Sequence, residues 1–360
     1  MSKVFFLPAS SMSADGYRRL LAGFADRFPA GTTELIAVKI HAGEQGNTRY
    51  VRPDRVNSVI EGLGLPQGRV FLTDTTVLYR GRRLTAPSYM TLASEHGFGA
   101  PSTPPFIVAD GLRGTDEVAV KLPSCCENPT ARIAKAICEA DALVAVSHFK
   151  AHLLAGFGGA LKNLGMGCSS RGGKLFQHSS VKPVIRQNRC TACGTCAAHC
   201  PEHAIAVDRS ASIVSSRCVG CGECIARCPA GAISVDWNQD QGVFTRRMVE
   251  HALAVQTVTR VSLCVNFLTD IAPDCDCMED SGGLLVDDLG VLASTDPVAV
   301  DQASLDLVTA APAARKSPAP GAGAGTDKFR AIRPSIDDTA QLALAQSLGL
   351  GSRSYELESV

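Results

Sequence analysis

The stretch CTACGTCAAHCP at residues 190–201 is followed by CVGCGECIARCP at residues 218–229. Both have the spacing C-x2-C-x2-C-x3-C-P, and the likeness continues beyond the cysteines, because the Ala-Ile pair at 204–205 recurs at 232–233. The two runs are therefore an internal duplication. They predict a small unit, built from two equivalent halves, in the middle of the chain.

The spacing predicts two four-iron, four-sulfur clusters. Three closely spaced thiolates wrap one cubane, and the cysteine before the proline turns away to the other cluster. A zinc ribbon, the alternative, uses C-x2-C pairs and needs neither the third cysteine nor the proline. The runs resemble bacterial two-cluster ferredoxins over roughly 50 residues. The predicted ligand sets are Cys190, Cys193, Cys196 and Cys228 for one cluster, and Cys218, Cys221, Cys224 and Cys200 for the other.

Strands and helices alternate on the N-terminal side of these runs. Proline begins and glycine ends an apolar helical pattern over 53–62. A second helix is expected after Pro129, where Ile133, Ile137 and Ala140 are spaced for one face. Such alternation is typical of a mostly parallel sheet covered by helices, so the fold class is α/β. The expected strands are 35–40, 70–74, 106–109 and 143–147.

The alternation resumes on the C-terminal side, so we expect the cysteine runs to be an insertion. The pattern predicts a helix over 245–255, a strand over 261–265, and helices over 298–307 and 335–348. The predicted domains are an α/β domain made of 1–185 and 238–360, and a dicluster ferredoxin-like domain over 186–237. Residues 310–326, rich in Ala, Pro and Gly, are expected to be a flexible linker or loop.

Composition limits the partners. Lys+Arg and Asp+Glu are 35 each, and no dense basic run occurs, so we expect no nucleic-acid binding. No apolar run approaches membrane-spanning length, and the N-terminal apolar stretch is too short for a signal-peptide core. We therefore expect a cytoplasmic protein without membrane insertion. In that compartment, 15 cysteines favour metal or redox chemistry over a disulfide scaffold.

A glycine-rich segment, residues 147–167, directly follows a predicted strand. It brings two histidines, two lysines and several glycines to the carboxyl end of that strand, where ligand sites form in parallel sheets. The glycines would let backbone N–H groups reach a phosphate or another anion. The alternative is a tight packing turn with solvated lysines. His41 and Glu44 follow another predicted strand in the same way. They would be acid–base groups or part of a solvated turn.

Other candidates carry weaker signals. Cys264, Cys275 and Cys277 would supply thiolates for a further metal, but buried inert thiols are the simpler interpretation. A disulfide between the adjacent Cys125 and Cys126 is not expected in a reducing compartment, and Cys168 follows the glycine-rich segment. Four acids suit helix caps and loops better than a cation site; they are Asp287, Asp288, Asp296 and Asp301.

Taken together, several blocks make nearly the whole chain resemble the DUF362 proteins, a family of iron–sulfur centre proteins without a settled reaction. The blocks are KIHAGEQGN, VFLTDTTVLYRG, ADGLRG, SHFKAHLLAGFGGALKNLGMG, SSRGGKLFQH, CDC and STDPVAVDQASLDL. The resemblance implies cluster binding but no particular reaction.

A fainter resemblance is to the nickel-pincer lactate racemase family, which has a histidine, an AG-x-x-GG loop, a lysine and a second histidine in that order. It implies that His152 is an acid–base group, Lys162 a cofactor anchor and His178 a metal ligand. The matching glycines are Gly156, Gly158 and Gly159. That family's D-x-T-R element appears here as Asp74-Thr-Thr-Val, without the arginine. We take the resemblance to imply a shared scaffold and pocket, not racemase activity.

Three functions remain open. In the first, the clusters carry electrons to or from a cofactor or small-molecule substrate near His152, Lys162 and His41, as in an oxidoreductase. In the second, the protein delivers electrons or clusters to a redox partner protein. In the third, the clusters are structural and the pocket performs racemase-type chemistry. Two clusters in one small domain favour electron transfer over a structural role. The pocket would hold a further metal, a flavin or a nucleotide-type cofactor.

Overall fold

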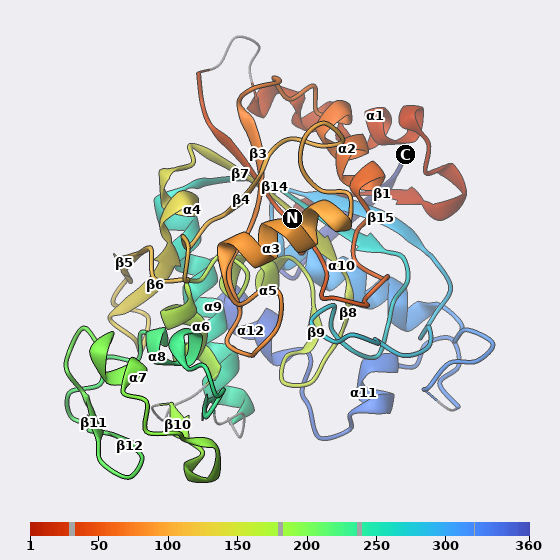
Figure 1. The fold of residues 1–360 in the computed structure, drawn as a ribbon. Helices are drawn as coiled ribbons and strands as arrows, with labels where there is room; N and C mark the ends of the chain where they lie inside the picture. The colour runs from red at the N-terminus through yellow and green to blue at the C-terminus, as the bar shows by residue number, and fades with distance from the viewer. Residues whose placement is uncertain (29–32, 179–182, 236–239, 320) are drawn as a thin grey trace.

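The computed structural model describes the chain except residues 29–32, 179–182, 236–239 and 320 (Figure 1). Its centre is an eight-stranded sheet. From one edge to the other, the strands are β16 (Tyr355–Ser359), β1 (Ser2–Pro8), β15 (Gly290–Ser294), β14 (Arg260–Leu268), β7 (Ala142–His148), β2 (Ile36–Lys39), β3 (Val70–Asp74) and β4 (Phe106–Val108).

The sheet is mostly parallel, as the alternation of strands and helices predicts. Strands β14, β7, β2, β3 and β4 all run parallel to their neighbours within this group. Only β15 is antiparallel, to both β14 and β1, while β1 and β16 are parallel to each other. Every residue of β7, ALVAVSH, is buried, because helices cover both faces of a central parallel strand. The α/β fold class is therefore confirmed.

Alternate residues of each strand pack into separate cores on the two faces. In β7, Leu143 and Ala145 belong to one core, and Val144 and Val146 belong to the other. Helices α5 (Ala160–Gly165), α9 (Gln241–Val258) and α10 (Pro297–Ala310) cover the first face. Helices α1 (Ala14–Leu21), α2 (Pro53–Gly62) and α3 (Ala86–Glu95) cover the second face. The strand period of two thus gives a three-layer sandwich.

Two sequence-based predictions differ from the structure. The helix expected after Pro129 is a strand, β6 (Thr130–Ala134), paired antiparallel with β5 (Glu117–Lys121), and only α4 (Lys135–Glu139) is helical. Within β6, Ala131 and Ile133 are buried on one side, so a strand period was mistaken for a helical one. At the C-terminus, the helix is only α12 (Ala340–Ser347), after the short α11 (Lys328–Ile332).

The cysteine runs lie in a small lobe beside the main sandwich, drawn in green in Figure 1. Gly194 and Gly222 occupy equivalent places before α7 and α8, with φ angles of 74° and 72° that favour glycine. The lobe has its own apolar core, which Leu78 and Leu175 of the main fold join. Its elements are β10 (Val184–Ile185), η3 (Gln187–Arg189), α7 (Thr195–Ala198), β11 (Ile205–Val207), β12 (Ala211–Ile213), α8 (Glu223–Arg227) and β13 (Ile233–Ser234).

The segment rich in Ala, Pro and Gly, 310–326, lies against the main fold. Past the end of α10, its described part contains neither helix nor strand, yet Ala319 and Ala322 are buried in the first core. The ammonium group of Lys328 donates hydrogen bonds to the carbonyls of Thr309 (2.8 Å) and Gly323 (2.9 Å). Those bonds join both ends of the segment, which is a packed loop in its described part.

No helix in the described part of the chain is long and apolar enough to cross a membrane.

A buried carboxylate joins α10 to the start of α5. Asp301 accepts hydrogen bonds from the backbone N–H groups of Ala160 (2.7 Å) and Leu161 (2.9 Å) and from the Asn266 amide (2.7 Å). Burial raises the pKa of Asp301 to about 6, and the hydrogen bonds oppose that shift. Asp301 therefore caps α5, the helix that carries Lys162.

We predict that Asp301→Ala lowers the free energy of unfolding by about 2–4 kcal/mol, because three buried donors lose their acceptor. Denaturant titration at pH 7 measures it. Asp287→Ala removes an exposed carboxylate nearby and should change stability by less than about 0.5 kcal/mol. Equal effects of the two substitutions would contradict the capping role.

Candidate functional site

A pocket lies where several parallel strands end. Lys39, Asp74 and His148 are the last residues of β2, β3 and β7, and all three line it. The hairpin of β8 (Lys150–His152) and β9 (Gly156–Gly158) continues from β7, and α5 follows the hairpin. The carboxyl edge of a parallel sheet is where ligand sites form, because the chain leaves each strand there in a loop.

Most of the predicted pocket residues meet in this one place. His41, His152, Lys162 and His178, the last at the end of α6 (Arg171–His178), all line the pocket. Gly158 and Gly159 line it as well. Gly156 does not; its φ is +80°, and a Cβ there would lie 2.2 Å from Asp338 Cβ. Gly156 thus permits close packing of the hairpin and makes no contact with the pocket.

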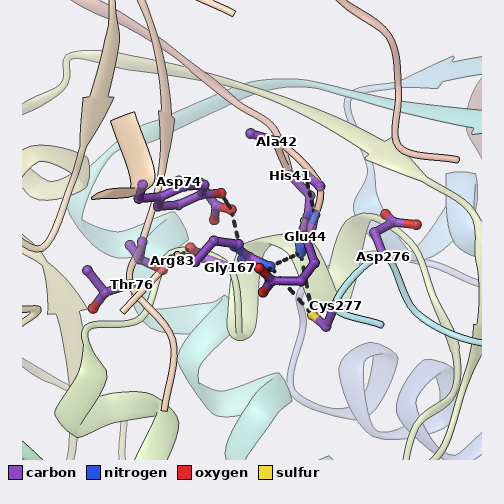
Figure 2. A network of polar contacts seen from close by, with 12 residues as sticks. His41, Ala42, Glu44, Asp74, Thr76, Arg83, Gly167, Asp276 and Cys277 are labelled. Carbon is purple, nitrogen blue, oxygen red and sulfur yellow. Dashed lines mark hydrogen bonds and ion pairs between the residues drawn. The ribbon is translucent and has the colours of Figure 1, made fainter. Parts of the chain in front are cut away.

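Asp74 is the centre of a buried ion cluster that sequence reasoning missed (Figure 2). Its carboxylate lies 2.8 Å from Lys39 Nζ and 3.3 Å from Arg83 Nη2, and the Tyr89 hydroxyl donates to it. Burial alone would raise the pKa of Asp74, but Lys39 and Arg83 outweigh burial and hold the pKa well below its usual range. Asp74 is therefore a fixed negative charge.

Arg83 connects the Asp74 cluster to His41 and Cys277. Arg83 lies nine residues after Asp74 in the sequence, and its guanidinium group contacts the Asp74 carboxylate. Figure 2 shows its guanidinium between Asp74 on one side and His41 and Cys277 on the other. Nη1 lies 2.8 Å from His41 Nε2. The sequence signals for this arrangement were that Asp74 ends one predicted strand and that Lys39 lies one residue before the end of another.

A second ion cluster lies around Asp276. Its carboxylate lies 2.7 Å from His148 Nδ1 and 3.1 Å from Lys150 Nζ. Burial would raise the pKa of Asp276, but His148 and Lys150 lower it well below the usual range. Lys150 Nζ also donates to the carbonyl of His148 at 2.8 Å. These contacts hold the loop around Asp276 against the end of β7.

The two histidines predicted to act in catalysis are neutral. Burial, with Arg83 next, lowers the pKa of His41 well below 6.5. Burial and Lys162 do the same for His152. Backbone N–H groups of Leu154 (3.3 Å) and Ala155 (3.1 Å) donate to His152 Nδ1, so its proton sits on Nε2. His152 is thus suited to donate a hydrogen bond from Nε2.

The pocket carries more positive than negative charge. The carboxylates of Asp74, Asp276 and Glu44 face a larger number of cations. Burial lowers the pKa of Lys174 to about 8, and its ammonium donates to the Thr76 carbonyl at 2.5 Å. Such an excess would bind an anionic group. The five cations are Lys39, Arg83, Lys150, Lys162 and Lys174.

The eight clustered cysteines line two smaller concavities in the lobe. Backbone N–H groups four residues further on donate to Cys200 Sγ and Cys228 Sγ, each at 3.2 Å. The two halves of the lobe therefore repeat the same N–H to sulfur contact. One concavity includes Cys190, Cys193, Cys196 and Cys228; the other includes Cys200, Cys218, Cys221 and Cys224.

Among the residues that the structure describes, no three His, Cys, Asp or Glu side chains come close enough together to hold one metal ion.

The loop between β3 and α3 joins the lobe to the pocket. Leu78 lines the pocket and also belongs to the apolar core of the lobe. Two residues later, Arg80 Nη2 donates to the carbonyl of Pro229 at 3.3 Å. From α6, the aliphatic part of Arg171 packs against Gly222, which lies between Cys221 and Cys224 in the sequence. The loop and α6 therefore each contribute residues to both the pocket and the lobe.

The remaining sequence candidates have different outcomes. Cys277 lines the pocket and Cys275 contacts Lys162, whereas Cys168 and Cys264 are buried in the first core. Of the neighbouring pair, Cys125 is exposed and Cys126 half-buried. Asp296 caps α10, Asp288 accepts the Asp270 N–H, and Asp301 caps α5. The four acids therefore do not form one cation site.

The sheet, its carboxyl-edge pocket and the cysteine lobe define an α/β protein with a cysteine-rich lobe. The chain belongs to the family described as "Domain of unknown function (DUF362)", which matches residues 36–306. No curated protein matches the chain in sequence. A solved structure that it resembles is the lactate racemase apoprotein from Thermoanaerobacterium thermosaccharolyticum, with 15% identity and a TM-score of 0.39. The match covers 75% of this chain and 51% of that one, about half its length.

We predict that Asp74→Asn lowers the free energy of unfolding by about 3–5 kcal/mol, because Lys39 and Arg83 then stay buried without their counter-charge. Thermal or urea unfolding measures it. Asp54→Asn, on the exposed side of α2, is the matched control and should change stability by less than about 0.5 kcal/mol. A fully stable Asp74→Asn protein would show that the two cations do not depend on Asp74.

Proposed function

We propose that this chain is an iron–sulfur protein that binds two [4Fe-4S] clusters and transfers electrons to or from an anionic cofactor or substrate in the carboxyl-edge pocket. The observation that carries the proposal is the pairing of cysteines around the two concavities. Each concavity takes three cysteines from one run and the fourth from the other run. This is the crossed arrangement that the C-x2-C-x2-C-x3-C-P spacing predicts.

The surroundings of the cysteines suit clusters. The N–H groups of Ala204, Ala232 and Ala211 donate to Cys200, Cys228 and Cys190, at 3.2, 3.2 and 3.3 Å. Such donors stabilise negative charge on the thiolates and tune cluster potentials. When bound, the clusters would supply one-electron transfer. We propose residues 186–237 as a ferredoxin-like domain inserted into an α/β domain of 1–185 and 238–360.

The position of the pocket favours electron transfer over a structural role for the clusters. Leu78 belongs to both the pocket and the apolar core of the lobe, and the α6 residues Leu175 and Arg171 pack against the lobe. Cys193 is exposed on the lobe, where a redox partner protein would exchange electrons with the first cluster. The lobe would thus connect a partner at its surface to a ligand in the pocket.

The pocket residues suit an anion. Lys162 and Lys174 would bind its charge, and His152 would donate a hydrogen bond from Nε2. Gly158 and Gly159 would allow close approach of the ligand. His41 and His178 would complete the wall, the first as a neutral base held by Arg83. The phosphates of a flavin or nucleotide-type cofactor and a carboxylate substrate both have the required charge.

Anaerobically purified protein should contain about eight irons and eight sulfides per chain, and dithionite should bleach its visible absorption and produce cluster spin signals. Cys196→Ser should lose about half of the iron, because it removes a ligand from one cluster only. Cys138→Ser, half-buried in α4, is the control and should keep all of it. Stoichiometric zinc without sulfide in the wild-type protein would refute cluster binding.

Anion binding should weaken as the pH rises through about 8. Lys174 has a lowered pKa of about 8, so its ammonium is charged below that pH and neutral above it. Losing one charge near a bound anion should weaken binding roughly tenfold or more, at an effective dielectric constant of about 20. Sulfate does not titrate in this range, so calorimetric titration with sulfate from pH 7 to 9 measures the effect.

Lys174→Met should bind sulfate weakly and with little pH dependence over the same range. Lys121→Met, which removes an exposed lysine on β5, should behave as the wild type does. Wild-type affinity that does not change between pH 7 and 9 would show that Lys174 does not contact the anion.

A further inference from the structure

Cys277 lines the pocket, and the buried thiol of Cys275 lies next to it, so the two form a close pair. A turn brings them together, since the N–H of Met278 donates to the carbonyl of Cys275 at 2.9 Å. The two sulfurs lie 3.5 Å apart. Between them, Asp276 points away to His148 and Lys150, which hold the turn in place. The pair is therefore positioned by the fold, and neither thiol needs a large movement to reach the other.

Cationic and polar groups surround both sulfurs. Lys162 Nζ lies 3.6 Å from Cys275 Sγ, and Arg83 Nη1 lies 3.9 Å from Cys277 Sγ. His41 Nε2 lies 3.4 Å from Cys277 Sγ. The ammonium group of Lys162 stabilises the thiolate form of Cys275, in which the two sulfurs share one proton.

We propose that Cys275 and Cys277 are a redox-active dithiol that cycles with an intramolecular disulfide and exchanges with a small anionic disulfide substrate in the pocket. This inference goes beyond the proposed function. It depends on the pocket geometry alone and does not require the clusters, which sit in a separate lobe. The anionic preference follows from the excess of lysine and arginine around the pair.

The exchange balances in atoms and electrons. The Cys275 thiolate attacks one sulfur of the substrate disulfide, forms a mixed disulfide and releases the first substrate thiolate. That thiolate takes the proton of Cys277. The Cys277 thiolate then attacks Cys275 Sγ, closes the protein disulfide and releases the second substrate half as a thiolate. The protein loses two electrons and one proton, and the substrate becomes one thiol and one thiolate.

A packing role does not account for this environment. Cys264, a buried thiol in the first core, lies among apolar residues, and burial raises its pKa well above the usual value. Cys168 is similar, with a pKa raised to about 12 by burial. Cys275 differs from both in its direct contacts with a second thiol and with the ammonium group of Lys162. Cys264 is therefore the natural comparison for a thiol that only fills space.

The first experiment uses the full chain in glutathione redox buffers, quenched with acid and alkylated under denaturing conditions. Peptide mass spectrometry should find 275 and 277 joined by a disulfide in oxidising buffers and both alkylated in reducing ones. Because the readout is a thiol count, it succeeds or fails independently of cluster content. Alkylation of both thiols at every buffer ratio would overturn the proposal.

The second experiment traps the intermediate and needs only one thiol. Cys277→Ser with oxidised glutathione should accumulate one glutathionyl group on Cys275, whereas Cys264→Ser should form the 275–277 disulfide as the wild type does. With the anionic oxidised glutathione, trapping should be at least about tenfold faster than with the cationic disulfide cystamine, and high salt should reduce that ratio. No adduct on Cys275, or equal rates with both disulfides, would contradict the assignment.

Discussion

The buried contact between Lys39, Asp74 and Arg83 determines how charge is distributed in the pocket. Two of these residues end adjacent parallel strands, so the sheet itself brings their charges together. Removing charged groups from water is costly, and only close pairing with opposite charge offsets that cost. The third residue, Arg83, requires the loop after β3 to fold back over the strand ends. The same loop also contacts the cysteine lobe. The pairing of Arg83 with Asp74 therefore positions residues of both the pocket and the lobe.

The carboxylates of the pocket are paired with cations, and further cations remain. Asp74 and Asp276 each have two basic partners, and their charges are fixed across the physiological range. Lys162 and Lys174 then remain as charges that an incoming anion can share. The two neutral histidines add hydrogen-bonding capacity without adding charge. Affinity for anions therefore comes from the arrangement of the ion clusters and not from the net charge of the chain, which is zero.

Sequence patterns predicted the parallel sheet, because buried strands such as β3 and helices such as α2 carry strong local signals. They failed over β6, where Ile133 fits a strand and a helix equally well. Spacing singled out the eight cysteines of the lobe and placed His152 and Lys162 at the carboxyl edge. Spacing did not identify Arg83 and gave only a weak signal for Cys275 and Cys277. The contacts that make these side chains important come from residues far away in the sequence.

The charge of the pocket depends on the state of the thiol pair. With one thiolate at Cys275, Lys162 has a counter-charge at 3.6 Å. A disulfide would remove that negative charge and leave Lys162 to pair with a bound anion. Anions should therefore bind the oxidised pocket more tightly, and by thermodynamic reciprocity a bound anion should favour the disulfide. In a site built from fixed ion clusters, the thiol pair is then the part whose charge changes with redox state.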